Sequence, residues 1–365
     1  MQALKKIGFY TAFILPVMAV YSFYQGGWYH LMPLLFIFVL LPLLDQLTGI
    51  DKTNVAPEFV KEKSTEFYYR FVTYVWVYVQ LVFVCWAVYV IATQPPAHPL
   101  AWIGFVISTG LITGGIGITV AHELGHKQSK LERFYSKMLL MTVCYMHFYI
   151  EHNRGHHVTV ATPEDPATAR KDENFYAFWV RSVTGSYLHA WVLEKQSLQR
   201  KGYAFFSIYN NMILFTLMPI LFCALLFVGV KMITGLWHGE VIVFFFGQSI
   251  VAFTLLELVN YVEHYGIVRK ELAPGKYERV NPLHSWNASH MISNFFLFQL
   301  QRHSDHHAFA HKRYQVLNHY DESPQLPFGY PTMILLALIP PLWFGIMNKK
   351  LAHWQLSAQA LSTSA

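Results

Sequence analysis

Charged side chains are scarce in this chain. Asp, Glu, Lys and Arg make up 13% of its 365 residues, whereas hydrophobic residues make up 54%. A typical soluble domain carries about a quarter charged residues. Between residues 71 and 122 there is no charged Lys, Arg, Asp or Glu at all. We therefore expect an integral membrane protein rather than a soluble one.

Cysteine is scarce as well. Cys85, Cys144 and Cys223 lie far apart in apolar sequence and form no CxxC pair. This spacing excludes a rubredoxin-type or iron–sulfur site within the chain and a disulfide framework. The net charge of +6 does not indicate a nucleic-acid partner, because basic residues of a membrane protein usually report its topology.

Six apolar stretches are long enough to cross a membrane, which takes about 20 apolar residues. Three short connections, YQGGWYH, QPPAHP and KMITGLWHGE, join them in pairs. We predict an all-α integral membrane protein with six transmembrane helices in three hairpins. The predicted spans are residues 7–25, 29–44, 71–93, 100–121, 207–230 and 241–262.

Lys and Arg are distributed asymmetrically about these spans. If the N-terminus is cytoplasmic, the three outer turns contain a single basic residue, Lys231, and the other 26 of the 27 lie on the cytoplasmic side. Basic residues favour cytoplasmic loops. We therefore expect both termini to be cytoplasmic. Residues 7–25 form too long an apolar stretch for a cleaved signal peptide.

Two hydrophilic regions, residues 121–206 and 263–325, are cytoplasmic in this arrangement. Together with the spans they are expected to form one membrane-embedded catalytic domain, residues 1–350. Residues 351–365 are rich in Ser, Ala and Gln, and we expect a disordered tail there.

A seventh apolar stretch, residues 332–347, contains Pro340-Pro341 and is followed by Lys349-Lys350. A full span would carry these lysines to the outer side, against the distribution of the other basic residues. We therefore expect a membrane-embedded or interfacial segment.

Histidine is abundant, with 19 residues against 21 acidic ones, and nine histidines fall in four motifs, HELGH, EHNRGHH, NYVEHYG and QRHSDHH. They are His122, His126, His152, His156, His157, His264, His303, His306 and His307. Helical residues three or four apart share a face. His122 and His126, His152 and His156, and His303 with His306 and His307 are thus expected to point at common sites. His157 is expected to reach a different ion from at least one of His152 and His156.

Several functions compete for this pattern. A single HxxxH pair is more often part of a solvated surface, but three such clusters on one membrane face are not expected by chance. HELGH also matches the HExxH helix of zinc metalloproteases, in which Glu is the general base. That interpretation leaves seven histidines unused. A metal transporter would hold its ligands near the bilayer midplane, whereas these motifs lie at helix ends. Nine imidazoles suit two ions with four or five ligands each.

The motif strings resemble those of the integral-membrane di-iron hydroxylase and desaturase superfamily. HELGHK, IEHNRGHH, NYVEHYG and LQRHSDHH, with ATPEDPATAR between them, resemble the bacterial membrane-bound alkane 1-monooxygenase (alkane ω-hydroxylase) family. The resemblance extends from LPLLD in the second span to GYP at Gly329. HExGHK and NYVEHYG distinguish this family from fatty-acid desaturases. Xylene monooxygenases are close relatives and remain an alternative.

The resemblance implies O2-dependent hydroxylation of n-alkanes to 1-alkanols at two non-haem iron ions held by the nine histidines. It also implies location in the bacterial cytoplasmic (inner) membrane, where a lipid-soluble alkane is available. Electrons come from a rubredoxin and its flavoprotein reductase in that family, and the lack of a CxxC pair agrees with separate partners. Five basic residues are expected to attract an acidic rubredoxin, although topology accounts for them equally well: Lys127, Lys130, Arg133, Lys312 and Arg313.

Metal-bound histidines usually donate their second ring N–H to a carboxylate or a carbonyl. The candidate partners are Glu257, Glu263, Asp165, Asp305, Glu151 and Asn294. Glu257 lies inside the sixth span, seven residues before His264, and an intramembrane carboxylate is usually functional. Replacement of Glu257 by Ala is therefore expected to lower iron content or activity. A capping or solvated role is the alternative, above all for Asp165 in the TPEDP turn.

The fourth span is rich in glycine just before HELGH, at Gly110, Gly114 and Gly117 among others. Small residues let helices approach closely. The other hypothesis is that the missing side chains leave a tunnel for the alkane. On that hypothesis, Gly114→Phe shortens the preferred alkane, whereas general loss of folding would indicate packing.

Overall fold

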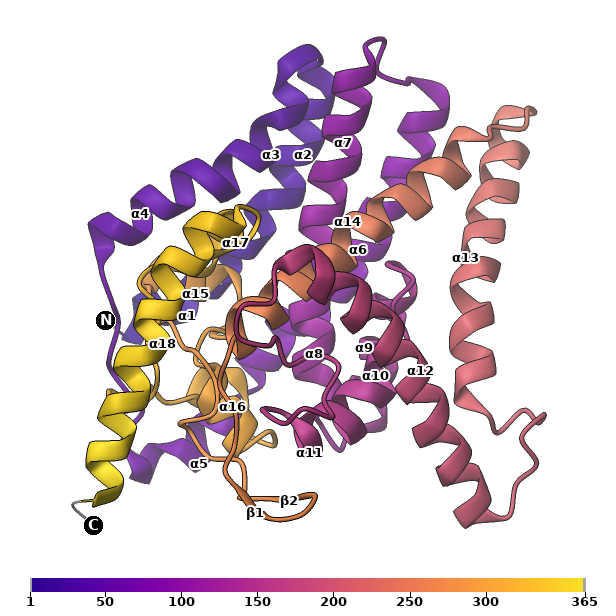
Figure 1. Cartoon of the computed structure of the whole chain (residues 1–365). Coiled ribbons are helices and arrows are strands. Elements are labelled where there is room, and N and C mark those ends of the chain that lie inside the picture. Colours follow the sequence, from indigo (N-terminus) through magenta and orange to yellow (C-terminus); the bar gives the residue numbers. More distant parts are fainter. Residues whose placement is uncertain (1, 364–365) are drawn as a thin grey trace.

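Helices form nearly all of the regular structure in the computed structural model, which describes residues 2–363 (Figure 1). Within these residues, six helical segments are long and apolar enough to cross a membrane. They are Lys5–Gln25, Gly27–Thr48, Phe67–Thr93, Pro99–Gly125, Asn211–Thr234 and Glu240–His264. The predicted all-α membrane fold is confirmed, and each predicted span overlaps one of these segments.

Three of the six spans are single helices, and three are assembled from shorter pieces. The single helices are α6 (Phe67–Thr93), α13 (Asn211–Thr234) and α14 (Glu240–His264). The first span contains α1 (Gln2–Gly8) and α2 (Ile14–Gln25), the second α3 (Met32–Leu35) and α4 (Leu41–Thr48), and the fourth α7 (Pro99–Ile112) and α8 (Thr119–Gly125). In Figure 1 the connections of α6 to α7 and of α13 to α14 lie at the upper end of the bundle.

The segments between the hairpins and after the third one gather toward the opposite, lower end of the bundle (Figure 1). They include α5 (Pro57–Thr65), α9 (Lys130–Met141), α10 (Phe148–Glu151), α11 (His157–Thr159), α12 (Phe175–Lys201), α15 (Met291–Phe296) and α16 (His303–Ala308). Strands β1 (Glu271–Ala273) and β2 (Lys276–Tyr277) form one small antiparallel hairpin. All four histidine motifs therefore reach the same end of the molecule.

The seventh apolar stretch forms parts of two helices rather than one. Helix α17 (Tyr330–Ala337) ends before Leu338, and α18 (Pro340–Thr363) begins at the Pro340-Pro341 pair. Proline fits the first turn of a helix, where its missing N–H has no intrahelical partner. The two prolines therefore lie in the first turn of α18, where they do not interrupt a helix.

Helix α18 continues through residues 351–363, where a disordered tail was expected. That expectation is wrong for these residues, whereas residues 364 and 365 lie outside the described part. Leu351 is 1% exposed and lies against Gly266, so the start of this segment is anchored on the protein. Ala, Leu and Gln also favour helix once it has started.

Close packing holds the fourth span against the sixth. A Cβ atom on Gly110 would lie 2.5 Å from Cβ of Val251, and one on Gly114 would lie 2.6 Å from the carbonyl oxygen of Ala252. Both contacts are closer than side-chain carbons tolerate, so only glycine allows this approach of the fourth span to α14. The two spans that end in histidine ligand candidates are thereby fixed side by side.

Candidate metal centre

The four histidine motifs come from four separate parts of the chain. HELGH occupies α8 and the residue after it, at the end of the fourth span, and His264 is the last residue of α14. EHNRGHH joins α10 to α11, and all three histidines of QRHSDHH lie on α16. All nine histidines are brought together in two groups at the ends of the fourth and sixth spans.

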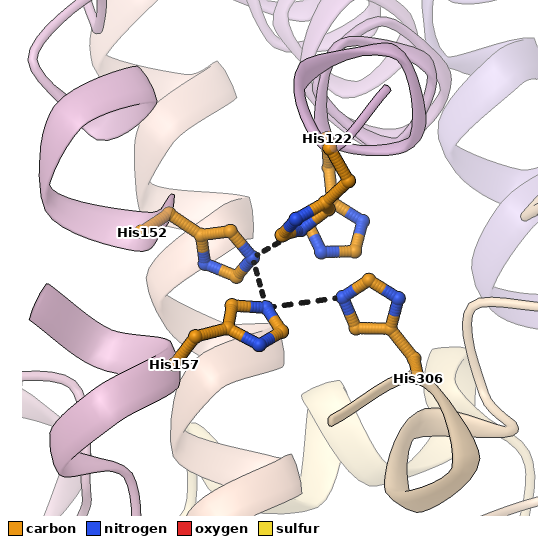
Figure 2. Close-up of side chains that lie close together, drawn as sticks. His122, His152, His157 and His306 are labelled. Atoms are coloured by element: carbon orange, nitrogen blue, oxygen red, sulfur yellow. Dashed lines mark hydrogen bonds between the residues drawn. The ribbon is translucent and has the colours of Figure 1, made fainter. Parts of the chain in front are cut away.

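The first group contains five histidines, whose ligand nitrogens all lie within 4.8 Å of one another: His122, His126, His152, His157 and His306. Nε2 of His152 lies 3.1 Å from Nε2 of His126 and 3.0 Å from Nε2 of His157. Nε2 of His306 lies 3.2 Å from Nε2 of His157. Figure 2 shows four of these imidazoles converging on one point from three segments of the chain.

The second group contains four buried histidines: His156, His264, His303 and His307. Nε2 of His303 lies 3.2 Å from Nε2 of His264 and 2.9 Å from Nε2 of His307. The two groups adjoin, because the ring centroids of His157 and His307 are 4.4 Å apart. The arrangement offers two neighbouring metal sites rather than one.

A π-helical turn at His152–His156 divides EHNRGHH between the two groups. In a π-helix the hydrogen bond runs from residue i to i+5, and such turns are frequent at functional sites. His152 therefore meets His157 five residues later, and His156 turns to the second group. The expectation that His152 and His156 share a site, based on α-helical spacing, is wrong. The expectation that His157 separates from at least one of them agrees with this grouping.

Helix α16 also divides its histidines. His303 and His307, four residues apart, lie in the second group, whereas His306 lies in the first. Successive residues of an α-helix differ by about 100° in direction, so a helix wedged between the two groups serves both. The expectation that His303, His306 and His307 point at one common site is wrong. In contrast, His122 and His126 share one group, as their spacing predicted.

The chemistry of both groups fits metal ions. Burial lowers the pKa of His126, His152, His157, His303, His306 and His307, and neighbouring histidines lower it further by repulsion between imidazolium charges. Neutral imidazole is the form that binds metals. Nε2 of His122 and of His156 is buried without a hydrogen-bond partner in the described structure. Ligand nitrogens about 2.1 Å from an ion are separated by roughly 3.0–3.4 Å in octahedral or tetrahedral geometry, close to the spacings found here.

Asp165 holds the second ring nitrogen of His156. Its Oδ2 lies 2.9 Å from Nδ1 of His156, and the hydroxyl of Thr168 donates to the same oxygen. Burial favours the neutral imidazole of His156, but the charge of Asp165 and this hydrogen bond outweigh burial and raise the pKa of His156. A proton kept on Nδ1 leaves Nε2 free to face the other members of the second group.

Glu263 lies at the edge of the second group. Its Oε2 is 3.1 Å from Nε2 of His303, and the hydroxyl of Tyr330 donates to its Oε1 at 2.6 Å. Both residues are buried, so the phenol fixes the direction of the carboxylate. Tyr330 was not singled out from the sequence, because nothing near GYP indicates that α17 folds back over the sixth span.

Glu257 does not reach the histidines as expected. Its carboxylate accepts hydrogen bonds from the hydroxyls of Tyr145 and Ser182, at 2.7 and 2.6 Å. Seven helical residues correspond to a rise of about 10.5 Å, so a shared helix face does not bring Glu257 into contact with His264. The carboxylate instead joins α14 to α12 and to the segment before α10.

The other three candidate partners also bind elsewhere. Glu151 accepts from Nδ1 of His189, Asp305 binds Lys312 and Tyr320, and Asn294 donates to the carbonyls of Ala288 and His290. Within the described structure none of them has a hydrogen bond to one of the nine imidazoles. His189, on α12, was not anticipated, because it lies outside every motif.

Glu123, the acid of HELGH, is not placed as a general base. Its Oε1 lies 3.0 Å from Nζ of Lys127, and it accepts from the backbone N–H of Tyr314. It belongs to neither histidine group. The metalloprotease interpretation needs this carboxylate beside the metal, and the salt bridge with Lys127 argues against it.

An apolar cavity leads away from the histidines. Its lining includes His122, His152 and His303 of the two histidine groups, together with Leu15, Ile37 and Phe38 of the first two spans. The cavity encloses about 860 Å³ of atom-free space, including its open part. Its lining is almost entirely apolar, so it suits a hydrophobic molecule whose end approaches the metal centre.

One of the three glycines expected to form a tunnel lines the cavity, and the other two do not. Gly114 lines the cavity, but Gly110 and Gly117 do not, and the Cβ position of Gly117 is occupied by the side chain of Gln80. The tunnel hypothesis is therefore wrong for Gly110 and Gly117, which serve helix packing. Gly115, next to Gly114, also lines the cavity. A Cβ atom added to Gly115 would lie 3.4 Å from Cδ2 of Leu255, its nearest neighbour.

One family model and several known enzymes are similar to this chain. A family model described as fatty acid desaturase matches residues 96–337. The chain is 43% identical to alkane 1-monooxygenase 2 of Pseudomonas aeruginosa over 359 residues, which cover 96% of this chain and 93% of that protein. It is 38% identical to alkane 1-monooxygenase of Ectopseudomonas oleovorans, over 93% of this chain and 83% of that protein.

A more distant similarity concerns the alternative substrate class. The chain is 29% identical to the hydroxylase component of the xylene/toluene monooxygenase of Pseudomonas putida, over 71% of this chain and 67% of that protein. This similarity is weaker and shorter than the two similarities to alkane 1-monooxygenases.

Proposed function

This chain belongs to the alkane 1-monooxygenase family, and we propose on that premise that it hydroxylates the terminal methyl group of n-alkanes with O2 at two non-haem iron ions. The observation that carries the proposal is the junction of two buried histidine groups with an apolar cavity. Neither feature alone specifies the reaction, but together they support a reaction in which the end of a hydrophobic chain meets bound metal.

The histidines would hold the two ions, five at one site and four at the other. Bound iron would supply the oxidising power that acid–base side chains lack toward an unactivated C–H bond. Asp165 keeps the Nδ1 proton of His156 and directs its Nε2 toward the second site. Tyr330 orients the Glu263 carboxylate at the edge of the same site.

The cavity would bind the alkane by removing it from contact with water and lipid. Burial of each methylene group is worth about 0.8 kcal/mol relative to water, although a substrate that arrives from the bilayer gains less. Leu255, Val259 and Ile334 contribute apolar walls, and His122 lies at the metal end. A linear chain in this cavity presents its terminal methyl group, rather than its middle, to the histidines.

We further propose a rubredoxin and its flavoprotein reductase as electron donors, since no redox cysteine pair occurs in the sequence. Three of the five basic residues expected to attract the donor are paired with carboxylates. Lys127 pairs with Glu123, Lys312 with Asp305 and Arg313 with Glu132. These three charges are neutralised locally, and only Lys130 and Arg133 of the predicted five have no carboxylate partner within the described residues.

The proposal is tested by anaerobic iron quantitation followed by O2-dependent assays on octane, longer alkanes, xylene and a peptide. Two iron ions per chain and a 1-alkanol product are expected. Preferential oxidation of xylene would assign the chain to the alternative substrate class. One zinc ion with peptide cleavage would contradict the proposal.

The role of the cavity is tested at Gly115. Gly115→Leu is expected to shorten the longest alkane that is hydroxylated, because the new side chain enters the cavity, while iron content is unchanged. Gly115→Ala is the matched control, since its Cβ meets Leu255 only at ordinary contact distance. An unaltered chain-length profile in a folded Gly115→Leu variant would show that the alkane binds elsewhere.

A further inference from the structure

A basic groove lies outside the metal centre, between α9, α10, the end of α12 and the start of α13. Five basic residues line it: Lys130, Arg133, Lys137, Arg154 and Lys201. No carboxylate is among its lining residues. It encloses about 1020 Å³ of atom-free space, including the part open to the surroundings. A concentration of like charge around one hollow indicates an anionic ligand.

Most of this positive charge is uncompensated within the described structure. Arg154 alone among the five has a carboxylate partner, Glu194 at 3.0 Å. The ammonium group of Lys137 lies 4.9 Å from the ring centre of Tyr149 and 5.8 Å from that of Phe215. Burial and the nearby charge of Arg133 lower the pKa of Lys137. An anion in the groove would relieve this repulsion.

The groove lies at the level where the fifth span leaves the membrane. Lys201 ends α12 and Asn211 begins α13, and both line the groove. The connection between them carries exposed aromatic and aliphatic side chains, with Phe206 86% and Ile208 80% exposed. Tyr203 and Tyr209 are also exposed in this connection, and tyrosine is enriched at the headgroup level of a membrane. The groove is therefore placed to meet lipid headgroups.

A largely apolar cleft on α13 adjoins the groove at Phe215. Phe215 lines both, and the cleft is otherwise formed largely by Tyr187, Pro219, Ile220 and Phe253. These residues come from α12, α13 and α14, and Ile220 is 52% exposed on the face of a membrane span. A positively charged hollow next to an apolar cleft matches the division of a phospholipid into headgroup and acyl chain.

We propose that the basic groove binds the phosphate of an anionic phospholipid from the surrounding bilayer, with one acyl chain in the adjoining cleft. Basic pockets between spanning helices are suited to acidic headgroups. An acidic protein could bind the same basic residues, but it would not occupy the apolar cleft. The lipid would join α9 to α12 and α13 and so support the helices around EHNRGHH.

The test compares a groove variant with a variant of equal charge change. The triple variant Lys130→Gln, Arg133→Gln, Lys137→Gln removes three groove charges, and Lys171→Gln, Lys270→Gln, Lys276→Gln removes three exposed charges on the same side of the bundle. Delipidated protein is titrated with phosphatidylglycerol or phosphatidylcholine in mixed micelles and analysed by native mass spectrometry. Wild type and the control are expected to prefer phosphatidylglycerol at least about tenfold, and the groove variant is expected to lose that preference.

Two further measurements separate lipid from other anions. Inorganic phosphate at the same concentration is expected not to displace the lipid, because it cannot occupy the cleft. Ile220→Trp narrows the cleft and is expected to weaken phosphatidylglycerol binding several-fold, with helical circular dichroism and metal content unchanged.

Equal binding of the two lipids by wild type, or undiminished phosphatidylglycerol preference in the groove variant, would overturn the proposal. A groove variant that keeps its lipid but shows a raised KM for reduced rubredoxin would instead identify a protein-docking surface. That outcome also contradicts the lipid assignment.

Discussion

At the residue scale, the nine imidazoles differ in what holds their second ring nitrogen. Asp165 holds Nδ1 of His156, whereas Nδ1 of His264, His303 and His307 is buried without a hydrogen-bond partner in the described structure. These three rings therefore lack a hydrogen bond that would orient them through Nδ1, although His303 contacts Glu263 through Nε2. A charged partner both orients an imidazole and strengthens it as a ligand, so Asp165 is expected to matter more than its place in a turn suggested.

Asp165→Asn is expected to weaken the metal site that contains His156. The amide keeps an acceptor for Nδ1 but removes the negative charge, and loss of such a partner typically costs about 10–100-fold in metal affinity. Iron retained per chain after dialysis against graded chelator measures the effect. Asp321→Asn is the control, because Asp321 is a surface residue whose side chain is 68% exposed. Equal retention by both variants would show that Asp165 has no role in holding the ion.

Glu257→Ala is expected to lower stability and to leave the metal content of the folded protein unchanged. The substitution leaves the buried hydroxyls of Tyr145 and Ser182 without their acceptor, at a cost of about 1–3 kcal/mol for each unsatisfied group. Thermal unfolding and iron per folded chain are measured together. A variant of native stability that has lost iron would restore the original expectation that Glu257 supports the ligands.

At the element scale, two π-helical stretches shape the site. One, Thr113–Ile118, lies in the fourth span directly before α8, and the other, His152–His156, sets the directions of three ligand candidates. The second stretch is tightly packed at Gly155. A Cβ there would lie 2.6 Å from Oε1 of Glu151 and 2.9 Å from the ring of His189.

Gly155→Ala is therefore expected to disturb this turn. The added methyl group displaces either Glu151 or His189, breaks their hydrogen bond, and should cost on the order of 1–3 kcal/mol together with part of the bound iron. Unfolding midpoint and iron content are the measurements. Gly229→Ala, in α13, is the matched control, because a Cβ there meets nothing within 4 Å. Similar behaviour of the two variants would show that the turn tolerates a side chain.

At the scale of the whole molecule, the histidine groups, the basic groove and the hairpin β1–β2 lie at one end of the helical bundle, and the short interhelical turns lie at the other (Figure 1). Basic residues are concentrated at the first end, which predicts its exposure to the cytoplasm.

Insertion of reporters tests this orientation. Alkaline phosphatase, active only outside the cytoplasm, is expected to be active when inserted at Gly235 and inactive at Gly275. Green fluorescent protein should give the opposite result. Both sites are glycines in turns, with nothing within 4 Å of their Cβ positions, so neither insertion should disrupt packing. The reverse pattern would place the metal centre on the outer side.

Much of the architecture was predictable because it depends on local composition. Long apolar runs identify spans, since an unbroken helix is the least costly way to satisfy backbone polar groups in lipid. The nine histidines were identified because their motifs have distinctive spacing. Helix α18 was missed, because the contact of Leu351 with Gly266 that anchors it joins residues far apart in sequence.

The sequence by itself determined the membrane class, the six spans and the set of candidate ligands. Only the tertiary structure decided how the ligands divide, because one π-helical turn sends His152 and His157 to the first group and His156 to the second. It also decided that Asp165 and Glu263, rather than Glu257, approach the imidazoles. The spacing of two residues in the sequence determines whether their side chains point to the same side of a helix. Whether a side chain contacts a given ligand also depends on the rise along the helix axis and on the helices packed against it.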